Sequence, residues 1–357
     1  MKSAALLVAL AGLAVGEATA ATAINYTQVE WLQGPSLAAA FNWETGNFDN
    51  GGIANYVPQV VARRLNLWAI NGLKQNVFRV QSTPNQALRN STRISSKKSY
   101  SGGGLFVFDV AHIPVGLWPA IWMVGVPTWP DMGEIDIIEG VHTTTQNTQS
   151  FHTGTGCYQG TAGFTNTYTL SGDLAYDCYA YAADNQGCST RDGSQKSYGA
   201  PFNAKGGGVF AVKWNTRGIA IYSWARDSIP ADVAAGAPTG VGWGTPTDLY
   251  VLLLFISFYP FVERMLMPDL TYRLLSDNCD IMSHFYEMKM VINTNLCGTW
   301  AGAVWDDDLS YAGAPGSPAN ATRVSTCNAY IQRGGYNAVK DAYWAINSIA
   351  IYNTTST

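Results

Sequence analysis

Hydrophobic and polar residues alternate in short runs along most of this chain. Runs typical of β-strands occur at 104–110 (GLFVFDV), 133–140 (GEIDIIEG), 208–214 (GVFAVKW) and 219–224 (IAIYSW), and clusters of Gly, Asn, Ser and Pro separate them. Helical periodicity is scarce, and only 56–66 (YVPQVVARRLN) is compatible with a short helix. The pattern predicts an all-β sandwich, and a length of 357 residues does not require more than one domain.

Three carboxylates, Glu134, Asp136 and Glu139, interrupt one of these apolar runs. Alternation along a strand places Glu134 and Asp136 on one face and the intervening Ile residues in the core. The same alternation would bury Glu139, where an unpaired carboxylate costs several kcal/mol. A one-residue β-bulge between Asp136 and Glu139 returns all three acids to one face, so the sequence predicts a bulged strand.

Three crowded carboxylates indicate acid–base chemistry. A retaining glycosidase uses two carboxyls about 5–5.5 Å apart, one as nucleophile and one as acid/base. Crowding predicts that at least one pKa is raised, which provides the proton for a general acid. Two other interpretations remain, a solvated strand face and a calcium site. No Lys or Arg lies between Trp118 and His152 to form a solvated face, and calcium prefers acids from loops.

Composition narrows the class of partner. Only 13% of the residues are charged, whereas 12% are aromatic, so the surface suits neutral ligands. The net charge is −4 and no cluster of Lys and Arg is present, which argues against nucleic acid.

The N-terminus predicts secretion. An apolar run from Ala4 to Val15 and the step Ala18-Thr19-Ala20 are typical of a cleaved signal peptide at 1–20, which leaves 21–357 as a single domain. A membrane anchor needs about 20 apolar residues, and Glu17 comes too early for one.

Cysteines and sequons fit an extracellular protein. Six cysteines without C-x-x-C spacing predict up to three disulfides, although the sequence does not specify their pairing. N-x-S/T sequons, which are compatible with glycosylation, occur at Asn25, Asn90, Asn320 and Asn353.

The residues around the acids resemble glycoside hydrolase family 16. WPAIW (118–122) and WPDMGEIDIIEG (129–140) are similar to its active-site strand in the bulged E-x-D-x-x-E form, and most of all to fungal laminarinase-type endo-β-1,3(4)-glucanases. The likeness extends through 76–83, 89–114, FHTGTGC (151–157) and LCGTWAG (296–302). It implies a β-jelly-roll sandwich of two antiparallel sheets with a concave substrate cleft.

The resemblance also implies roles for individual residues. Glu134 would be the nucleophile, Glu139 the acid/base, and Asp136 the residue that tunes and orients Glu134. Six further side chains would bind substrate: Trp122, Trp129 and Trp118, whose alternative is core packing; His152, which would contact the acids from the adjacent strand; Arg89, similar to a cleft arginine; and Trp243, similar to an aromatic on the acceptor side.

Two features depart from the family pattern. His142 stands where relatives carry Asn, and 251–275 is a hydrophobic insertion at a junction that is short and polar in relatives. Twenty-five residues correspond to about 75 nucleotides in frame, so we interpret the insertion as an unspliced intron; the alternative is a hydrophobic hairpin that docks on a partner or membrane. The sequence of the mature transcript distinguishes the two.

We therefore expect a secreted, monomeric endo-β-1,3(4)-glucanase that acts on β-glucan with retention. It would need no cofactor, bind no nucleic acid and have no membrane span; a structural calcium is compatible with this fold class, but the sequence names no ligands for it. Two alternatives stay open, a cell-wall glucan transglycosylase and a non-catalytic glucan-binding lectin-like protein.

Overall fold

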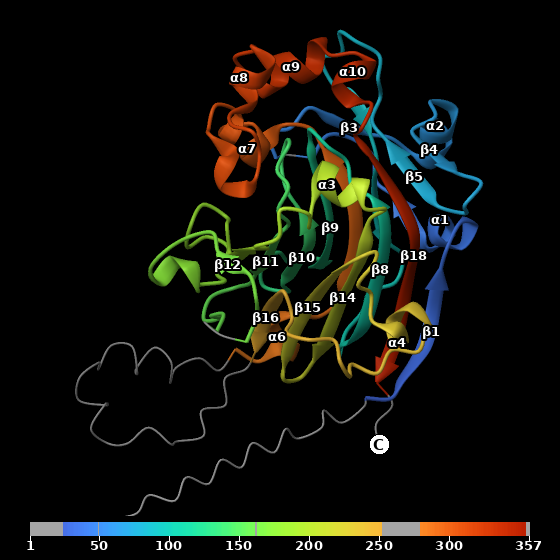
Figure 1. The fold of residues 1–357 in the computed structure, drawn as a ribbon, viewed down its shortest axis with the longest axis vertical. Helices are drawn as coiled ribbons and strands as arrows, with labels where there is room; N and C mark the ends of the chain where they lie inside the picture. The colour runs from blue at the N-terminus through green and yellow to red at the C-terminus, as the bar shows by residue number, and fades with distance from the viewer. Residues whose placement is uncertain (1–23, 49, 161–162, 252–278, 355–357) are drawn as a thin grey trace, which may run out of the picture.

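The structure is a computed structural model that describes residues 24–48, 50–160, 163–251 and 279–354. Two large antiparallel sheets dominate it, and Figure 1 shows them packed as layers. The predicted β-jelly-roll sandwich is confirmed.

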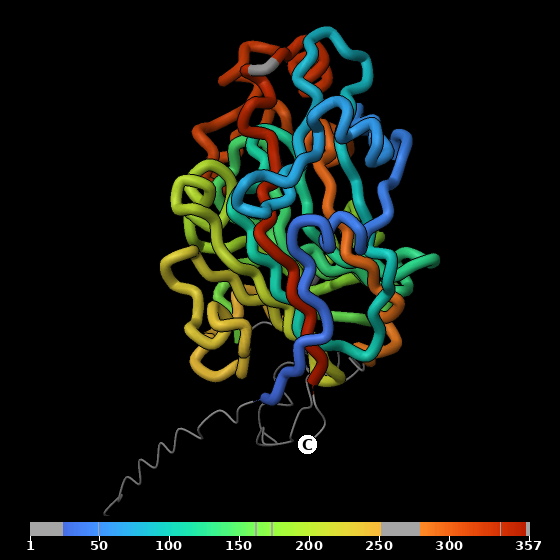
Figure 2. Tube along the Cα trace, turned by 90° about the vertical axis from the view of Figure 1, so that its right-hand side faces the viewer, coloured from blue at the N-terminus to red at the C-terminus, as the bar shows by residue number. Residues whose placement is uncertain are grey.

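The first sheet has eight strands, with β1 paired to β18 beside the main path. In path order they are β16 (Asp248–Val251), β15 (Gly218–Ala225), β14 (Gly208–Asn215), β8 (Gly104–His112), β18 (Tyr343–Thr354), β5 (Asn76–Arg79) and β4 (Trp68–Ile70), with β1 (Tyr26–Leu32) on β18. Figure 2 shows β1 and the end of β18 running side by side, so both ends of the domain lie together.

The second sheet also has eight strands. In order they are β12 (Thr167–Tyr168), β13 (Cys188–Arg191), β11 (Thr148–His152), β10 (Glu134–Glu139), β9 (Trp118–Gly125), β17 (Met288–Asn295), β7 (Arg93–Ser96) and β2 (Phe41–Trp43). A separate parallel pair joins β3 (Ala54–Tyr56) to β6 (Arg89–Ser91). The four predicted strand runs correspond to β8, β10, β14 and β15, which confirms them.

The main core lies between the two sheets. Phe106 and Phe108 of β8 belong to this core together with Ile135 and Ile137 of β10, and all four are at most 1% exposed. Because side chains alternate along a strand, the other face of β10 must point away from the first sheet. Glu134, Asp136 and Glu139 are on this other face, which we call the acid face.

Helices are short and lie outside the two sheets. They are α1 (Pro35–Ala40), α2 (Gln59–Arg64), η1 (Asp173–Ala175), α3 (Gly199–Ala204), α4 (Ala231–Ala234), α6 (Ile281–His284), α7 (Gly298–Ala301), η3 (Ala303–Trp305), η4 (Leu309–Ala312), α8 (Pro318–Thr322), α9 (Cys327–Arg333) and α10 (Tyr336–Val339). The stretch with helical periodicity became α2, as predicted. The group from α7 to α10, which gathers at one end of the sandwich in Figure 1, was not predicted.

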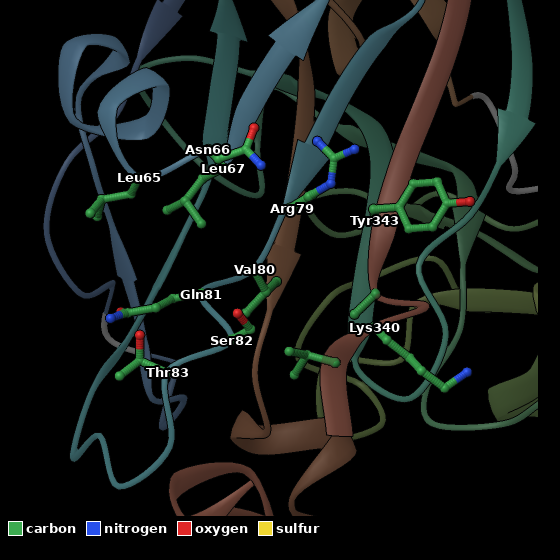
Figure 3. Close-up of a pocket in the computed structure, with 12 residues that line it drawn as sticks. Leu65, Asn66, Leu67, Arg79, Val80, Gln81, Ser82, Thr83, Lys340 and Tyr343 are labelled. Atoms are coloured by element: carbon green, nitrogen blue, oxygen red, sulfur yellow. The ribbon is translucent and has the colours of Figure 1, made fainter. Parts of the chain in front are cut away.

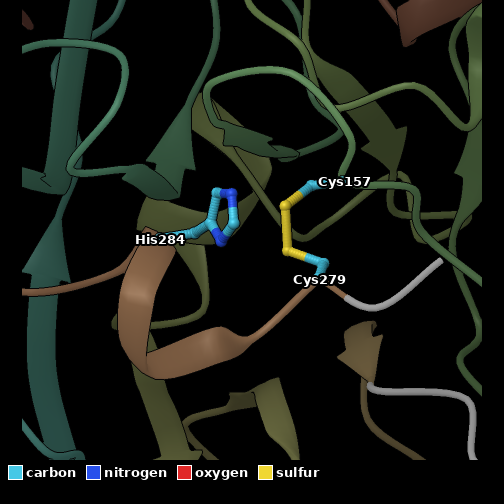
Figure 4. A group of neighbouring side chains, drawn as sticks. All are labelled: Cys157, Cys279 and His284. Carbon is cyan, nitrogen blue, oxygen red and sulfur yellow. A yellow bond between two sulfur atoms is a disulfide. The ribbon is translucent and has the colours of Figure 1, made fainter.

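Three disulfides form, as the cysteine count predicted: Cys157–Cys279, Cys178–Cys188 and Cys297–Cys327. The first ties the loop after β11 to the segment before α6 (Figure 4). The third lies in a separate apolar cluster with Trp305 and Ile331, where it holds the α7–α10 group to the end of β17.

Two predicted segments lie mostly outside the described residues. The signal peptide at 1–20 falls there entirely, and of the insertion at 251–275 only Val251, the last residue of β16, is described. No helix in the described part of the chain is both long and apolar enough to cross a membrane.

Candidate active site

The predicted bulge lies between Asp136 and Glu139. On β11, Asp136 pairs with Ser150 and Glu139 with Thr148, so three steps along β10 match two steps along its neighbour. The pairing of β10 with β9 also shifts register at this place, between Asp136 and Ile138. The extra residue turns Glu139 back to the acid face, beside Glu134 and Asp136.

Asn147 satisfies the backbone groups that the bulge frees. Its Oδ1 accepts a hydrogen bond from the backbone N–H of Glu139 at 3.0 Å, and its Nδ2 donates to the carbonyl of Ile137 at 2.9 Å. Gln149 Nε2 also donates to the Ile137 carbonyl, at 3.2 Å. Buried backbone groups rarely stay unpaired, so these amides hold the bulge in place. Sequence reasoning missed both; two amides close after a bulged strand were the available signal.

All three carboxyls are largely shielded from water. The side chain of Glu134 is 16% exposed and that of Asp136 is 5% exposed. Burial raises the pKa of Glu134, Asp136 and Glu139 to about 8, and the charge of Asp136 adds to the rise at both glutamates. The cluster therefore keeps at least one proton at neutral pH, as the crowding predicted.

His152 contacts the acids from the adjacent strand, where the resemblance placed it. It pairs across from Glu134, and its Nε2 lies 3.1 Å from Asp136 Oδ2 and 3.9 Å from Glu134 Oε1. Asp136 and His152 thus share a hydrogen bond between two buried groups. This bond fixes the carboxyl of Asp136 between the two glutamates.

Each glutamate accepts a hydrogen bond from a tryptophan. Trp129 Nε1 donates to Glu134 Oε2 at 2.7 Å, and Trp118 Nε1 donates to Glu139 Oε1 at 2.8 Å. An indole N–H can only donate, so each bond favours the ionised carboxylate and lowers its pKa. These bonds bring Trp129 and Trp118 to the acids, and both side chains are only partly buried.

A second aromatic ring contacts each of these tryptophans. Tyr181 meets Trp129 edge-to-face at a centroid distance of 5.7 Å, and Trp300 meets Trp118 in the same manner at 5.9 Å. Glu134 and Glu139 are therefore each bonded to a tryptophan that a second aromatic ring contacts. The two second rings come from distant parts of the chain.

Trp122 of β9 also lies on the acid face, where it pairs directly with Asp136 of β10. Its Nε1 donates to Asn293 Oδ1 at 2.7 Å, and the guanidinium of Arg93 lies 5.0 Å from the centre of its ring. Arg93 and Asn293 are paired on β7 and β17. Sequence reasoning missed both residues, although Arg93 lies within the 89–114 stretch that carries the family resemblance.

Arg89 does not reach the acid face, which corrects the expectation that it binds substrate. Its residue is fully buried, and its guanidinium donates to the backbone carbonyls of Gln81 and Ile331, each at 2.5 Å, and of Gly334. Arg89 lies on β6, which pairs with β3 outside both large sheets. Its side chain fastens the end of α9 and offers no surface to a ligand.

Trp243 is also elsewhere, which corrects its assignment to the acceptor side. It is 4% exposed, donates to Asp232 Oδ2 at 3.0 Å, and packs edge-to-face on Tyr222 and Trp224. This cluster includes Leu105, whose side chain is on the face of β8 opposite the main core. Both sheets therefore separate Trp243 from the acids.

His142, the departure from the family pattern, is a packed residue. It is 3% exposed, its Nε2 lies 2.7 Å from the carbonyl oxygen of Ala301, and its ring meets Trp305 edge-to-face. His142 therefore connects the segment after β10 to the end of α7.

Within the described part of the chain, two groups of side chains have the spacing of metal ligands. Cys157, Cys279 and His284 form one, but the sulfurs of a disulfide are not the thiolates that bind metals (Figure 4). Glu134, Asp136 and His152 form the other, with donor atoms within 4.8 Å of one another. In this second group, the hydrogen bond between His152 and Asp136 already engages two of the donors.

A cavity of about 430 Å³ lies away from the acids (Figure 3). Residues 65–67 and 79–83 line it, together with residues near the start of β18 such as Lys340 and Tyr343. It belongs to the β5 and β18 side of the first sheet, and its described lining contains no carboxylate. The chemistry is therefore concentrated on the acid face rather than in this cavity.

Comparisons with known proteins identify the family to which a chain with these three carboxylates is similar. Residues 41–253 and 262–352 match the model of the XgeA-like catalytic domain of glycoside hydrolase family 16. A probable endo-1,3(4)-β-glucanase of Aspergillus clavatus is 33% identical over 366 aligned positions, which cover 99% of this chain and 51% of that protein. This chain thus spans about half the length of that relative.

Solved structures of the same family are also similar. Laminarinase 16A of Phanerochaete chrysosporium, solved with β-glucans in its donor and acceptor sites, is 31% identical with a TM-score of 0.74, over 92% of this chain and all of that one. An elongating family 16 β-1,3-glucosyltransferase is 29% identical with the same TM-score and coverage. Since the family match covers most of the sequence and the structure gathers the three predicted carboxylates on one strand face, this chain belongs to glycoside hydrolase family 16, in its XgeA-like group.

Proposed function

We propose that this protein is a secreted endo-β-1,3(4)-glucanase that hydrolyses β-glucan with retention at the anomeric carbon. The observation that carries the proposal is the bulged strand β10, which presents Glu134 and Glu139 on one face, each bound by a tryptophan indole. Family membership supports the reaction class, and the glucans bound to laminarinase 16A support the substrate class.

In the first step, a Glu134 oxygen attacks the anomeric carbon while Glu139 donates its proton to the departing glycosidic oxygen. The bond from carbon to that oxygen breaks, and a glycosyl ester to Glu134 forms. Glu134 must be ionised for this attack, and the indole N–H of Trp129 favours that form. Burial and the charge of Asp136 raise the pKa of both glutamates, so the cluster holds a proton, and the proposal assigns that proton to Glu139.

In the second step, Glu139 removes a proton from a water molecule, and the water oxygen attacks the same carbon. The ester bond breaks, which returns Glu134 to its carboxylate form and Glu139 to its acid form. Two inversions give net retention. Asp136 and His152 position Glu134 between the steps, and neither step uses a metal or a cofactor.

Glucan rings would lie on the tryptophans beside the acids. Trp118, Trp122 and Trp129 are only partly buried, and flat indole faces suit the apolar faces of pyranose rings. Their N–H groups already bond to protein acceptors, which fixes the orientation of each ring.

Secretion is part of the proposal. The three disulfides suit an oxidising compartment, and they accord with the signal-like N-terminus.

Digestion of a panel of glucans, with chromatography of the products, tests the function. The expected result is the appearance of oligosaccharides of several lengths from β-1,3- and mixed-linkage glucans, with the β-anomer seen first by NMR. Binding without new reducing ends would contradict hydrolysis and indicate a lectin, and products longer than the substrate would indicate transfer. A Glu134→Gln protein in parallel excludes a contaminating hydrolase.

A further inference from the structure

The acid face continues beyond the catalytic residues across β11 and β13. Asp136 pairs with Ser150, which pairs in turn with Ser189, and Glu139 leads in the same way through Thr148 to Arg191. Neighbouring strands are about 4.8 Å apart, so β13 lies about 10 Å from the acids. This is far enough to hold a sugar unit beyond the one under attack.

The middle of this stretch carries small polar side chains. Ser150 Oγ donates to Ser189 Oγ at 2.9 Å, and both residues are buried. Both positions carry small side chains whose hydroxyl groups bond to each other.

Two exposed tyrosines connect through their packing partners to the two ends of β10, where Glu134 and Glu139 lie. Tyr181 is 61% exposed and packs against Trp129, the hydrogen-bond donor to Glu134. Tyr311 is 54% exposed and packs against Arg191. Arg191 of β13 pairs with Thr148 of β11, which pairs in turn with Glu139. No other tyrosine whose exposure the structure describes is more than half exposed.

Both rings are held in place despite their exposure. Tyr181 follows Cys178, whose disulfide to Cys188 anchors the loop to β13, and its ring also meets Tyr179 edge-to-face at 5.5 Å. Tyr311 is in η4, and the guanidinium of Arg191 lies 4.8 Å from its ring centre. An exposed aromatic that is already immobilised loses little conformational entropy on binding a ligand.

We propose that Tyr181 and the Tyr311–Arg191 pair contact the glucan chain beyond the sugar unit under attack, on the β11–β13 side of the acids. The ligand class is a neutral β-linked glucan. The aromatic rings of the two tyrosines can stack on the apolar faces of pyranose rings, and their hydroxyl groups can hydrogen-bond to the hydroxyl groups of the sugar. This inference rests on the proposed function, since it concerns the same substrate.

The test is the dependence of binding on chain length. β-1,3-Glucan oligosaccharides of three to seven units are titrated calorimetrically into Glu134→Gln proteins that also carry Tyr181→Ala or Tyr311→Ala. We expect the Glu134→Gln parent to gain affinity as the chain lengthens, and each alanine variant to lose about tenfold on the longest oligosaccharide and much less on the shortest. Tyr181→Phe and Tyr311→Phe retain the ring and should keep the gain.

Trp31→Ala provides the matched control. Trp31 is 45% exposed on β1 of the first sheet, so its removal deletes an exposed aromatic without touching the acid face. Equal losses at every chain length, or full retention of the length dependence in both alanine variants, would overturn the subsite. Binding is measured without turnover, so failure of the wild-type protein to hydrolyse glucan would contradict the proposed function separately.

Discussion

The indole Nε1 of Trp129 donates a hydrogen bond to Glu134 Oε2 at 2.7 Å, whereas that of Trp118 donates to Glu139 Oε1 at 2.8 Å. The two glutamates have opposite tasks in the proposed mechanism, since one must be ionised and the other protonated. Equivalent hydrogen bonds on the two residues should therefore affect opposite limbs of the pH–rate profile.

Trp129→Phe removes the donor that favours ionised Glu134, so the pKa of Glu134 should rise. The acidic limb of kcat/KM should move to higher pH by about one unit. Trp118→Phe should raise the pKa of Glu139 in the same way and move the alkaline limb instead. Trp122→Phe is the matched control, because its indole bonds to Asn293 and not to an acid. Identical shifts in all three variants would argue against the division of roles.

Glu134→Ala should lower the rate of glucan hydrolysis by more than about a hundredfold, because the nucleophile is lost. Azide should partly restore turnover of an activated aryl glycoside, and the glycosyl azide formed should have the inverted configuration. NMR of this product checks the assignment. A variant with substantial residual activity would show that Glu134 is not the nucleophile.

Glu139→Gln removes the proton donor but keeps the shape of the side chain. Substrates with good leaving groups need little protonation, so their first step should slow far less than the cleavage of glucan. Parallel kinetics on dinitrophenyl glycosides and on laminarin measure the difference. Equal losses on the two substrates would contradict the acid/base role.

The raised carboxyl pKa values also predict how stability depends on pH. A carboxyl whose pKa rises from about 4.5 in the unfolded chain to about 8 in the folded protein binds its proton more tightly when folded. Its contribution to stability is present below about pH 4.5 and is lost as the pH rises through 8. Glu139→Gln should therefore raise Tm at pH 8 by at least about 2 °C relative to its effect at pH 4. Calorimetry that finds the same change at both pH values would contradict the burial effect.

Arg89 and Arg93 should respond differently to substitution by Lys. Arg89→Lys loses the planar fork that serves three carbonyls, so the free energy of unfolding should fall by about 2 kcal/mol or more while KM stays unchanged. Arg93→Lys weakens a contact with Trp122 on the acid face and should chiefly raise KM. Denaturant unfolding and steady-state kinetics on both proteins provide the comparison. A raised KM with normal stability in Arg89→Lys would restore Arg89 as a substrate contact.

Arg89 and Arg93 also show where sequence reasoning reached its limit. Both are in one continuous stretch, yet β6 pairs with β3 outside the large sheets while β7 joins the second sheet. Nothing in the local pattern indicates this change of partner. Trp243 was misplaced for a similar reason, since a Gly-rich neighbourhood does not reveal which face of which sheet the ring will cover.

The sequence by itself determined the chemistry of strand β10 and the class of fold. Alternation of side chains is a local property, so the acids, the buried Ile residues and the bulge between them could all be derived from ten consecutive residues. The α7–α10 group was not foreseen, because its helices are too short to show a periodicity.

The surroundings of the acids were decided only by the tertiary structure. Asn147 is close in sequence, but Asn293, Trp300 and Tyr311 reach the acid face through pairings and packing that span more than 100 residues. Such contacts depend on which strands become neighbours and on which face each side chain then lies. These are outcomes of packing the whole core, and no short segment of the sequence encodes them.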